Sequence, residues 1–478
     1  AIPTAAAPHS DAEADALFDA SRTGSIAQKL DRYIKETYLP RPVRSAENPV
    51  MKNIKLAYFT VFAVLTVLWF AADTLIPDPY EFFKLRATLM NFTGILAMGA
   101  MSVAIILATR PVAIESFVGG LDKTYRLHKW LGITALVVSI IHWGWAQIPR
   151  WMVGWGWLVK PAKKPRVEES VEIFRFLRSQ RGLAEQIGEW AFYVAVVLIV
   201  LALVKRFPYR HFFKTHRLLA IVYLFLVFHS VVLMKFSYWG SAVGPLMGVL
   251  MAGGTVAALV SLFRKVGAGR RAVGVIDELL RYTDNRVLKV GLTLKDRWPG
   301  HEAGQFAFVT FNPAEGPHPF TISSAWHNDG KMFFLVKGIG DYTEPLPATL
   351  KLGDGVTVEG PYGRFSFAGS KPRQIWVAGG IGITPFIARM QALATTPDGK
   401  EIDFFYSTSA PDAAFIDKVK RRAEEAGVRL HVLLAGTDGA EGNRVGHDQA
   451  DGRFDPPGRR AQHGPLGRGT AAGAVPAV

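Results

Sequence analysis

The sequence predicts a membrane-embedded bundle of α-helices, followed by a soluble half made of β-strands and an α/β unit. Hydrophobic residues make up 49% of the 478 residues and charged residues only 20%, below the usual charged fraction of about 25%. Six apolar stretches are long enough to cross a bilayer. After Arg264 the apolar residues come instead in short alternating runs separated by Gly, Pro and Asp, which is typical of strands.

The apolar stretches are each about 17 to 25 residues long, the length that a bilayer core requires of a helix. We expect an integral membrane protein in contact with the lipid bilayer. The six expected spans are 55–76, 89–109, 128–148, 189–205, 216–235 and 244–263.

The chain contains no cysteine. This excludes disulfides, iron–sulfur clusters and covalently attached c-type haem within the sequence. The net charge of +15 is compatible with nucleic-acid binding, but cytoplasmic loops of membrane proteins are also rich in Lys and Arg, and no basic run carries interleaved aromatic residues. We therefore expect no nucleic-acid partner.

Lysine and arginine near the span ends predict the orientation. Basic clusters precede the first span, separate the second from the third and the fourth from the fifth, and follow the sixth. All four lie on one side, which we expect to be the cytoplasm of a plasma (inner) membrane, together with the soluble half. The loop 149–188 is also basic but must lie outside. Its glutamates and tryptophans favour an amphipathic segment at the membrane interface.

Four histidines lie within the spans: His128 and His142 in the third, His216 and His229 in the fifth. Each pair is separated by about 20 Å along its helix axis. A histidine at a span end is often only an interfacial side chain. Two cross-helix pairs at matched depths, however, are what two stacked b-type haems with two axial histidines each require.

One feature of the fifth span does not fit this arrangement. Its two histidines, 13 residues apart, point roughly 140 degrees apart around an ideal helix. We expect an underwound or π-bulged helix there.

Two stretches of the soluble half carry polar groups in strand-like contexts. In HPFTISSA, residues 318–325, successive side chains of a strand point to opposite faces, so the Phe320 ring can pack on a ligand while the Thr321 hydroxyl contacts the ligand's polar edge. An ordinary barrel strand has the same pattern. In FFLVKGIGDYT, residues 333–343, Thr343 is expected to open a helix whose N-terminus, with Lys337 nearby, binds a pyrophosphate. GDGVTVEGPYGRF, residues 353–365, is expected to close the barrel.

A glycine turn follows a buried strand in QIWVAGGIGITPF, residues 374–386. Strand, glycine turn and helix start are the context that a dinucleotide phosphate needs. The next strand, EIDFFYSTS, ends without the acidic residue that favours an unphosphorylated ribose, and Lys418, Lys420 and Arg421 follow it. This pattern favours NADPH over NADH, which remains possible.

With these motifs in order, the chain resembles the ferric reductase and NADPH oxidase superfamily from about residue 50 to residue 436. The resemblance rests on the six spans with two histidine pairs, then HPFTISS, VKGIGDYT, GPYGRF and GGIGITPF. It implies a ferredoxin-reductase-like module, with a β-barrel that binds FAD and an α/β lobe that binds NADPH.

Carried over by motif, the resemblance assigns roles to individual residues. Thr321, with Phe320, is expected at the flavin edge that accepts hydride. The nicotinamide dinucleotide's phosphates are assigned to Gly379, Gly380, Gly382 and Pro385. The flavin contacts implied are His318, Pro319, Phe320, Thr321, Lys337, Tyr342 and Thr343.

Two features depart from the pattern of the superfamily. The usual final strand with a Cys-Gly-Pro element is missing, and the chain instead enters a Gly-, Pro- and Ala-rich tail that resembles a truncated or frame-shifted end. Oxidases of the superfamily often carry a further histidine one turn beyond the outer haem ligand, where this chain has Ala146, so dedicated superoxide production is less favoured.

The resulting domain prediction has five parts. They are a soluble, partly helical extension without a cleavable signal peptide (1–50), the six-span di-haem domain (51–266), the FAD-binding barrel (267–370), an incomplete NAD(P)-binding lobe (371–436) and a disordered tail (437–478). The expected function is passage of electrons from cytoplasmic NAD(P)H through FAD and two haems b to an acceptor across the membrane, such as a ferric chelate. The alternatives are a superoxide-producing oxidase that uses dioxygen and a catalytically impaired haem-binding membrane protein.

Overall fold

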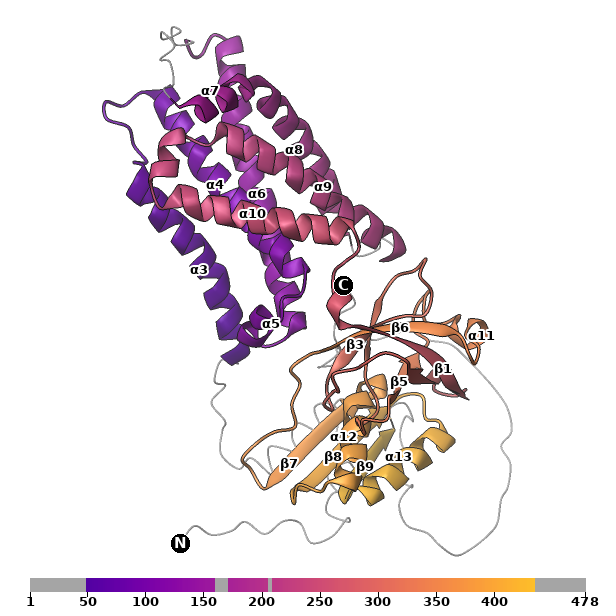
Figure 1. The fold of residues 1–478 in the computed structure, drawn as a ribbon. Coiled ribbons are helices and arrows are strands. Elements are labelled where there is room, and N and C mark those ends of the chain that lie inside the picture. Colours follow the sequence, from indigo (N-terminus) through magenta and orange to yellow (C-terminus); the bar gives the residue numbers. More distant parts are fainter. Residues whose placement is uncertain (1–48, 160–170, 205–208, 435–478) are drawn as a thin grey trace, which may run out of the picture.

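The computed structural model describes residues 49–159, 171–204 and 209–434, and Figure 1 shows their arrangement. The long helices form one bundle, and the sheet-containing part of the chain lies beyond one end of it. The predicted N-terminal extension up to residue 48 and the predicted tail 437–478 lie outside the described residues.

Six of the described helices are long and apolar enough to cross a membrane. Large apolar side chains remain exposed on their outer faces, for example Phe59 (64%), Trp190 (72%) and Val249 (70%). A helix that is apolar on both its inner and outer faces is typical of a membrane span, and the six predicted spans are confirmed as helices of that kind. They are α3 (Pro49–Ala72), α4 (Phe82–Ala108), α6 (Leu121–Gly154), α8 (Arg181–Leu203), α9 (Tyr209–Leu233) and α10 (Val243–Leu262).

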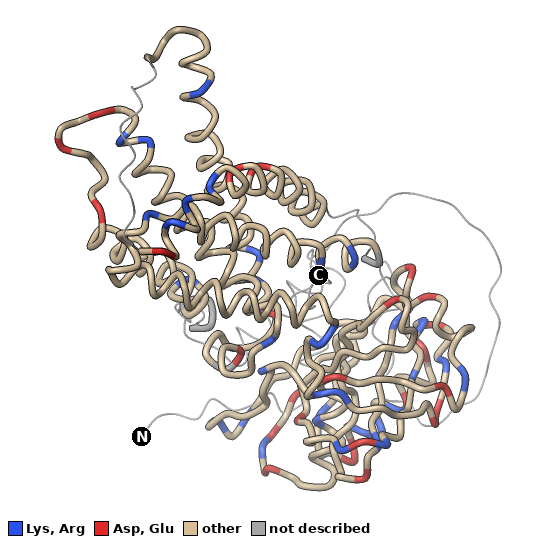
Figure 2. The backbone as a smooth tube through the Cα atoms, turned by 45° about the horizontal axis from the view of Figure 1, so that its top comes forward, with Lys and Arg blue, Asp and Glu red and all other residues tan. Residues whose placement is uncertain are grey.

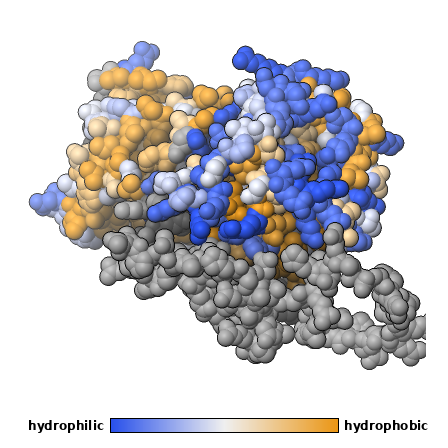
Figure 3. Space-filling model, turned by 90° about the horizontal axis from the view of Figure 1, so that it is seen from below, coloured by the Kyte–Doolittle hydropathy of each residue, from blue (hydrophilic) through white to orange (hydrophobic). Residues whose placement is uncertain are grey.

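The distribution of charged residues agrees with a membrane-spanning bundle and a soluble sheet-containing part. Figure 2 shows long stretches of the bundle without a charged residue and many charged residues in the sheet-containing part. Seen from below in Figure 3, apolar residues gather on the side of the bundle and hydrophilic residues on the side of the soluble module.

The two histidine-bearing helices pack mainly on other helices rather than on each other. The helix α6 packs mainly on α4, and α9 mainly on α8, while α6 and α9 make little direct backbone contact. The expected π-bulge in α9 is not found, because the helix is α-helical from Tyr209 to Leu233. The histidines pair without it, because the ring centroids of His142 and His229 lie 6.3 Å apart, and Nδ1 of His229 lies 2.9 Å from the carbonyl oxygen of Ala184 on α8.

The first soluble unit is an antiparallel sheet in the order β4-β3-β6-β1-β2-β5. An isolated bridge between Ile322 and Phe334 joins its two edges, so the sheet curls into a barrel around a core that includes Val290 and Val358. Residues 353–365 contribute β6, which pairs with both β1 and β3 and so completes the barrel, as expected. The strands are β1 (Arg271–Tyr282), β2 (Val287–Leu294), β3 (Phe306–Thr310), β4 (His318–Thr321), β5 (Lys331–Lys337) and β6 (Gly355–Tyr362).

The second soluble unit is a parallel sheet in the order β7-β8-β9 with two connecting helices. Parallel neighbours need such crossover helices. It meets the barrel where the ring of Phe415 contacts that of Tyr282, with 5.1 Å between centroids. Its elements are β7 (Arg373–Gly379), α12 (Thr384–Thr395), β8 (Glu401–Thr408), α13 (Ala413–Glu425) and β9 (Val428–Leu434).

Candidate functional site

The histidine pair nearer the barrel joins α6 to α9. The ring centroids of His128 and His216 lie 5.9 Å apart, with their planes at 67°. Nδ1 of His128 lies 2.8 Å from the carbonyl oxygen of Ala104 on α4. A carbonyl can only accept, so Nδ1 carries the proton and Nε2 keeps its lone pair for a metal. Nδ1 of His216 is buried and has no partner among the described residues, and its ring stacks on Phe212.

The second pair lies farther along the same two helices. The ring centroids of His142 and His229 lie 6.3 Å apart, with their planes at 78°. The Thr93 hydroxyl donates to the carbonyl oxygen of Leu89 at 2.7 Å, so it accepts from Nδ1 of His142 at 3.1 Å. Nδ1 of His229 donates to the carbonyl oxygen of Ala184, so this ring also carries its proton on Nδ1. Three of the four histidines are therefore held in the tautomer that leaves Nε2 unprotonated.

Two glycines provide the room for the second pair. A Cβ on Gly188 of α8 would lie 1.9 Å from Nδ1 of His229, and a Cβ on Gly94 of α4 would lie 3.4 Å from Cε1 of His142. The first distance is far shorter than van der Waals contact, so a side chain on Gly188 must displace the ring. The helices α8 and α4 can approach the two imidazoles because both positions lack a side chain.

The spacing within each pair is compatible with a metal held between two imidazoles. A metal–imidazole bond is about 2 Å, and each ring centre lies about 1 Å beyond its nitrogen, which gives about 6 Å between ring centres. The two centroid distances of 5.9 and 6.3 Å are close to this value. Among the described residues no group of three or more His, Cys, Asp or Glu could hold a metal ion, so the pairs suit a metal that brings its other ligands with it, as haem does.

A buried ion-pair network joins the helix bundle to the barrel. Arg110, just after α4, forms a salt bridge with Glu359 of β6, donates to the Tyr125 hydroxyl at 2.8 Å and lies 3.7 Å from the ring centre of Phe308. The nearby carboxylate of Glu359 and the Tyr125 hydroxyl raise the pKa of Arg110 despite its burial.

The same junction contains a backbone contact and an apolar cluster. Glu115 of α5 (Val112–Val118) accepts from the backbone N–H of Gly363 at 2.9 Å. Leu121 is buried together with Phe308 and Tyr362, and Tyr125 packs on them. Since Tyr125 precedes His128 by three residues, about one helical turn, the barrel lies beneath the first histidine pair.

The structure brings several of the predicted flavin-site residues together. His318 and Tyr342 stack with 3.6 Å between ring centres and 9° between planes. Burial lowers the pKa of His318 to about 4, so the ring is neutral at physiological pH. Phe320 is half-buried, with its ring against Phe311 and Phe334 of the barrel core, and Thr321 and Pro319 complete the same edge strand β4.

Thr343 does not open a helix as expected. It lies in a turn, where its hydroxyl accepts from the backbone N–H groups of Ile339 at 3.0 Å and Gly340 at 3.4 Å, and the short helix α11 (Leu346–Thr349) begins three residues later. The Thr343 hydroxyl accepts hydrogen bonds from backbone N–H groups within the turn, as Ser and Thr side chains often do, and it does not cap a helix. The predicted helix N-terminus at Thr343 is therefore wrong.

The glycine turn lies between β7 and α12 as the sequence predicts. Gly379 ends β7, a 3-10 turn spans Gly380–Ile383 and includes Gly382, and Pro385 occupies the first turn of α12. Gly380 has φ +51, and a Cβ there would lie 3.9 Å from Nζ of Lys337. A cleft at this edge is lined by Lys337, Gly380 and Thr408 among others. Lys337 of the first soluble unit and Gly380 of the second therefore line the same cleft.

Sequence reasoning missed the junction and one cation. Arg110 and Glu359 are 249 positions apart, and no local pattern marks them as partners. Arg217 follows His216, and its Nη1 is buried without a partner among the described residues. An arginine next to a predicted haem ligand is a signal that could have been used.

Comparisons with known proteins agree with this division of the chain. Residues 93–227 match the model of the ferric reductase like transmembrane component, and residues 274–366 match that of an FAD-binding domain. The chain therefore has the ferric reductase/NADPH oxidase architecture.

The curated relatives match over short stretches. The heme-dependent oxidative N-demethylase beta subunit of Ectopseudomonas mendocina is 36% identical over 87 residues, 18% of this chain and 27% of that protein. The ferredoxin–NAD(+) reductase component of the alkene monooxygenase system of Xanthobacter autotrophicus is 28% identical over 152 residues, 31% of this chain and 45% of that protein. The matches thus span less than half of each relative.

Solved structures match the chain in part as well. The FAD/NAD binding domain of nitric oxide dioxygenase from Vibrio cholerae is 19% identical, with a TM-score of 0.31, covering 36% of this chain and 76% of that one. The cytochrome b5 reductase domain of Ulva prolifera nitrate reductase is 20% identical, with a TM-score of 0.30, covering 35% and 74%.

Proposed function

Starting from the ferric reductase/NADPH oxidase architecture, we propose that this chain is a transmembrane oxidoreductase that passes electrons from cytoplasmic NAD(P)H through FAD and two haems b to an acceptor across the membrane. The observation that carries the proposal is the pair of cross-helix histidine contacts at two depths of one bundle, His128 with His216 and His142 with His229. When bound, haem and flavin supply one- and two-electron redox chemistry that side chains lack.

The residues around the histidines fit haem. The Nδ1 bonds of His128, His142 and His229 orient these rings and leave Nε2 as the ligand atom. The buried Nη1 of Arg217, beside His216, has no partner among the described residues, and a haem propionate would supply one. Iron ligation would also compensate for the polar rings that the sequence places within apolar spans.

The edge strand β4 and the glycine turn fit the two nucleotide cofactors. The stack of His318 on Tyr342 and the neighbouring Phe320 would hold the flavin, with Thr321 at its polar edge, Pro319 beside it and Thr343 ordering the adjacent turn. Backbone N–H groups of the turn Gly379, Gly380 and Gly382, which precedes Pro385, would bind the dinucleotide's phosphates, with Lys337 opposite. These assignments rest on the motifs and on their common location.

The junction beneath the first histidine pair supports the order of transfer. Arg110 and Glu359 hold the barrel against the end of the bundle that carries His128. The flavin site would therefore lie on the side of that pair, which the basic span ends assign to the cytoplasm of a plasma (inner) membrane. The second pair would then lie nearer the outer acceptor, a ferric chelate in the favoured case.

An anaerobic titration and an aerobic assay of the same protein separate this function from its two alternatives. The purified full chain, loaded with haem and FAD, is treated anaerobically with NADPH, then NADH, and finally dithionite while its haem absorbance is recorded. The proposal predicts haem reduction by NADPH. Reduction by dithionite alone would instead support the impaired haem-binding protein. A second, aerobic assay tests the oxidase, which superoxide formation at the rate of NADPH consumption would support.

A further inference from the structure

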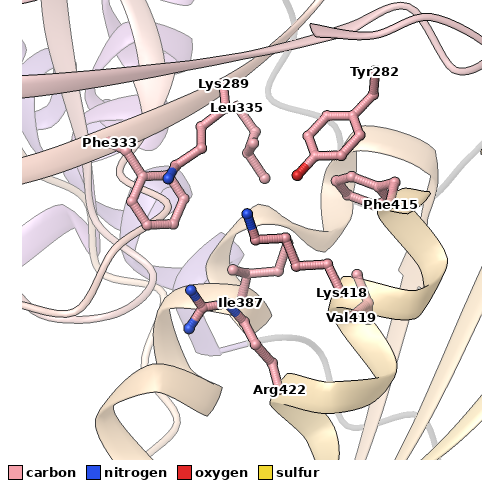
Figure 4. Close-up of a pocket in the computed structure, with 9 residues that line it drawn as sticks. All are labelled: Tyr282, Lys289, Phe333, Leu335, Ile387, Phe415, Lys418, Val419 and Arg422. Atoms are coloured by element: carbon pink, nitrogen blue, oxygen red, sulfur yellow. The ribbon is translucent and has the colours of Figure 1, made fainter. Parts of the chain in front are cut away.

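A second cleft lies between the barrel and the nucleotide lobe, away from the glycine turn. It is formed by strands β1, β2 and β5 on one side and helices α12 and α13 on the other. Figure 4 shows Lys289 and Tyr282 entering from the barrel, and Lys418 and Arg422 from α13. The Tyr282 hydroxyl and the Lys418 ammonium point toward the middle of the cleft, and Nζ of Lys289 lies over the ring of Phe333. We call this second cleft the α13 cleft.

The α13 cleft concentrates positive charge in a partly buried place. Lys289 is only 13% exposed and pairs with Glu278, while Glu425 attracts Arg422 from the same helix. Burial lowers the pKa of Lys418, and the charge of Lys289 lowers it further. Half-buried cations that repel one another are stabilised by a bound anion, because their interaction is poorly screened by water.

The donors in the α13 cleft suit a phosphate. An arginine offers a planar fork to two phosphate oxygens, and the lysines act as point charges. The buried Tyr282 adds a hydroxyl donor. We propose that the α13 cleft binds a phosphate dianion, which Lys289 of the barrel and Lys418 and Arg422 of the lobe hold together.

The α13 cleft is separate from the cleft at the glycine turn. That cleft is lined by Gly380, Lys337 and Thr408, and Phe415 lines both. A phosphate in the α13 cleft therefore comes from one of two sources: a free phosphorylated molecule, or the 2′-phosphate of an NADPH whose pyrophosphate lies at the glycine turn. Either source would bridge the two soluble units. Only the NADPH arm of the test rests on the proposed function.

Binding is tested first without turnover. Inorganic phosphate is titrated into the full chain at constant ionic strength set by KCl, and its Kd is measured calorimetrically. The wild type is expected to bind, and the double variant Lys418→Met/Arg422→Met to bind about tenfold or more weakly. The variant Lys371→Met, which removes an exposed cation outside the α13 cleft, serves as the control and is expected to bind as the wild type does.

The source is then identified by steady-state kinetics with the same variants. If the 2′-phosphate is the ligand, the double variant raises KM for NADPH but not for NADH, and inorganic phosphate competes with NADPH. If a free phosphorylated molecule is the ligand, the double variant changes KM for NADPH and KM for NADH to the same extent. Absence of phosphate binding in the wild type, or equal binding by the double variant, overturns the proposal and leaves the proposed function untouched.

Discussion

Arg110, which follows the second membrane-spanning helix, forms a buried ion pair with Glu359 of the barrel. The Arg110 side chain is 10% exposed and the Glu359 side chain 3%, and Arg271 adds a second cation 3.3 Å from Glu359. Removing one partner of a buried pair leaves an uncompensated charge, at a cost of about 3–5 kcal/mol. This junction therefore determines where the barrel lies relative to His128.

Replacing Arg110 is expected to uncouple the two halves of the protein. In Arg110→Met, flavin reduction by NAD(P)H should be unchanged, while haem reduction should slow by at least about tenfold, because small displacements at a reacting geometry have large effects on rate. Stopped-flow absorbance follows both signals in one experiment. Lys351→Met, which removes an exposed barrel cation, should behave as the wild type; equal slowing of both signals in Arg110→Met would contradict a positioning role.

Removing a single axial histidine is expected to remove one haem. In His216→Ala the first pair is lost and the second is intact, so the haem content should fall by about half, since the pairs lie about 20 Å apart along the helices. The pyridine haemochrome assay of purified protein measures this content. His211→Ala, at an exposed position on the same helix, is the control, and a similar loss there would argue against specific ligation.

Gly188→Ala is expected to disturb the second pair alone. The added methyl would lie 1.9 Å from Nδ1 of His229, so the ring must leave its bond to Ala184. The haem optical spectrum should then show a loss of about half of the six-coordinate signal, because each pair ligates separately. A Cβ on Gly182 of the same helix meets nothing within 4 Å, so Gly182→Ala should leave the spectrum unchanged.

His301 is expected to make the barrel less stable in acid. Its Nδ1 accepts from Trp298 Nε1 at 3.3 Å and its Nε2 donates to the Ser324 carbonyl at 3.0 Å, so the neutral ring is satisfied and a second proton would face the Trp298 N–H. Burial lowers its pKa to about 4.

The direction of the pH effect follows from this shift. Between pH 6.5 and 4 the unfolded chain binds a proton at His301 that the folded barrel does not. The free energy of unfolding therefore decreases as the pH falls below 6.5. The loss at pH 5 is about 2 kcal/mol. Thermal unfolding of the full chain in detergent, compared with His301→Gln, measures it, and an equal pH dependence in the variant would rule His301 out.

Local patterns predicted the spans, the histidine pairs and the glycine turn. Span length, the 14-residue spacing of His128 and His142 and the strand–glycine–helix order are all properties of contiguous sequence. The pairing of Arg110 with Glu359 and the Ile322–Phe334 bridge depend on tertiary contacts, which no contiguous pattern specifies. The prediction of a helix start at Thr343 failed because its hydroxyl accepts from backbone N–H groups within the turn rather than capping a helix.

The most direct test of the account is the number of haems in the purified full chain. After expression with sufficient haem and mild solubilisation, the account predicts two haems b per chain, both low-spin with two histidine ligands. A protein that retains all four histidines and yet binds no haem, or binds it only in a five-coordinate form, would contradict it.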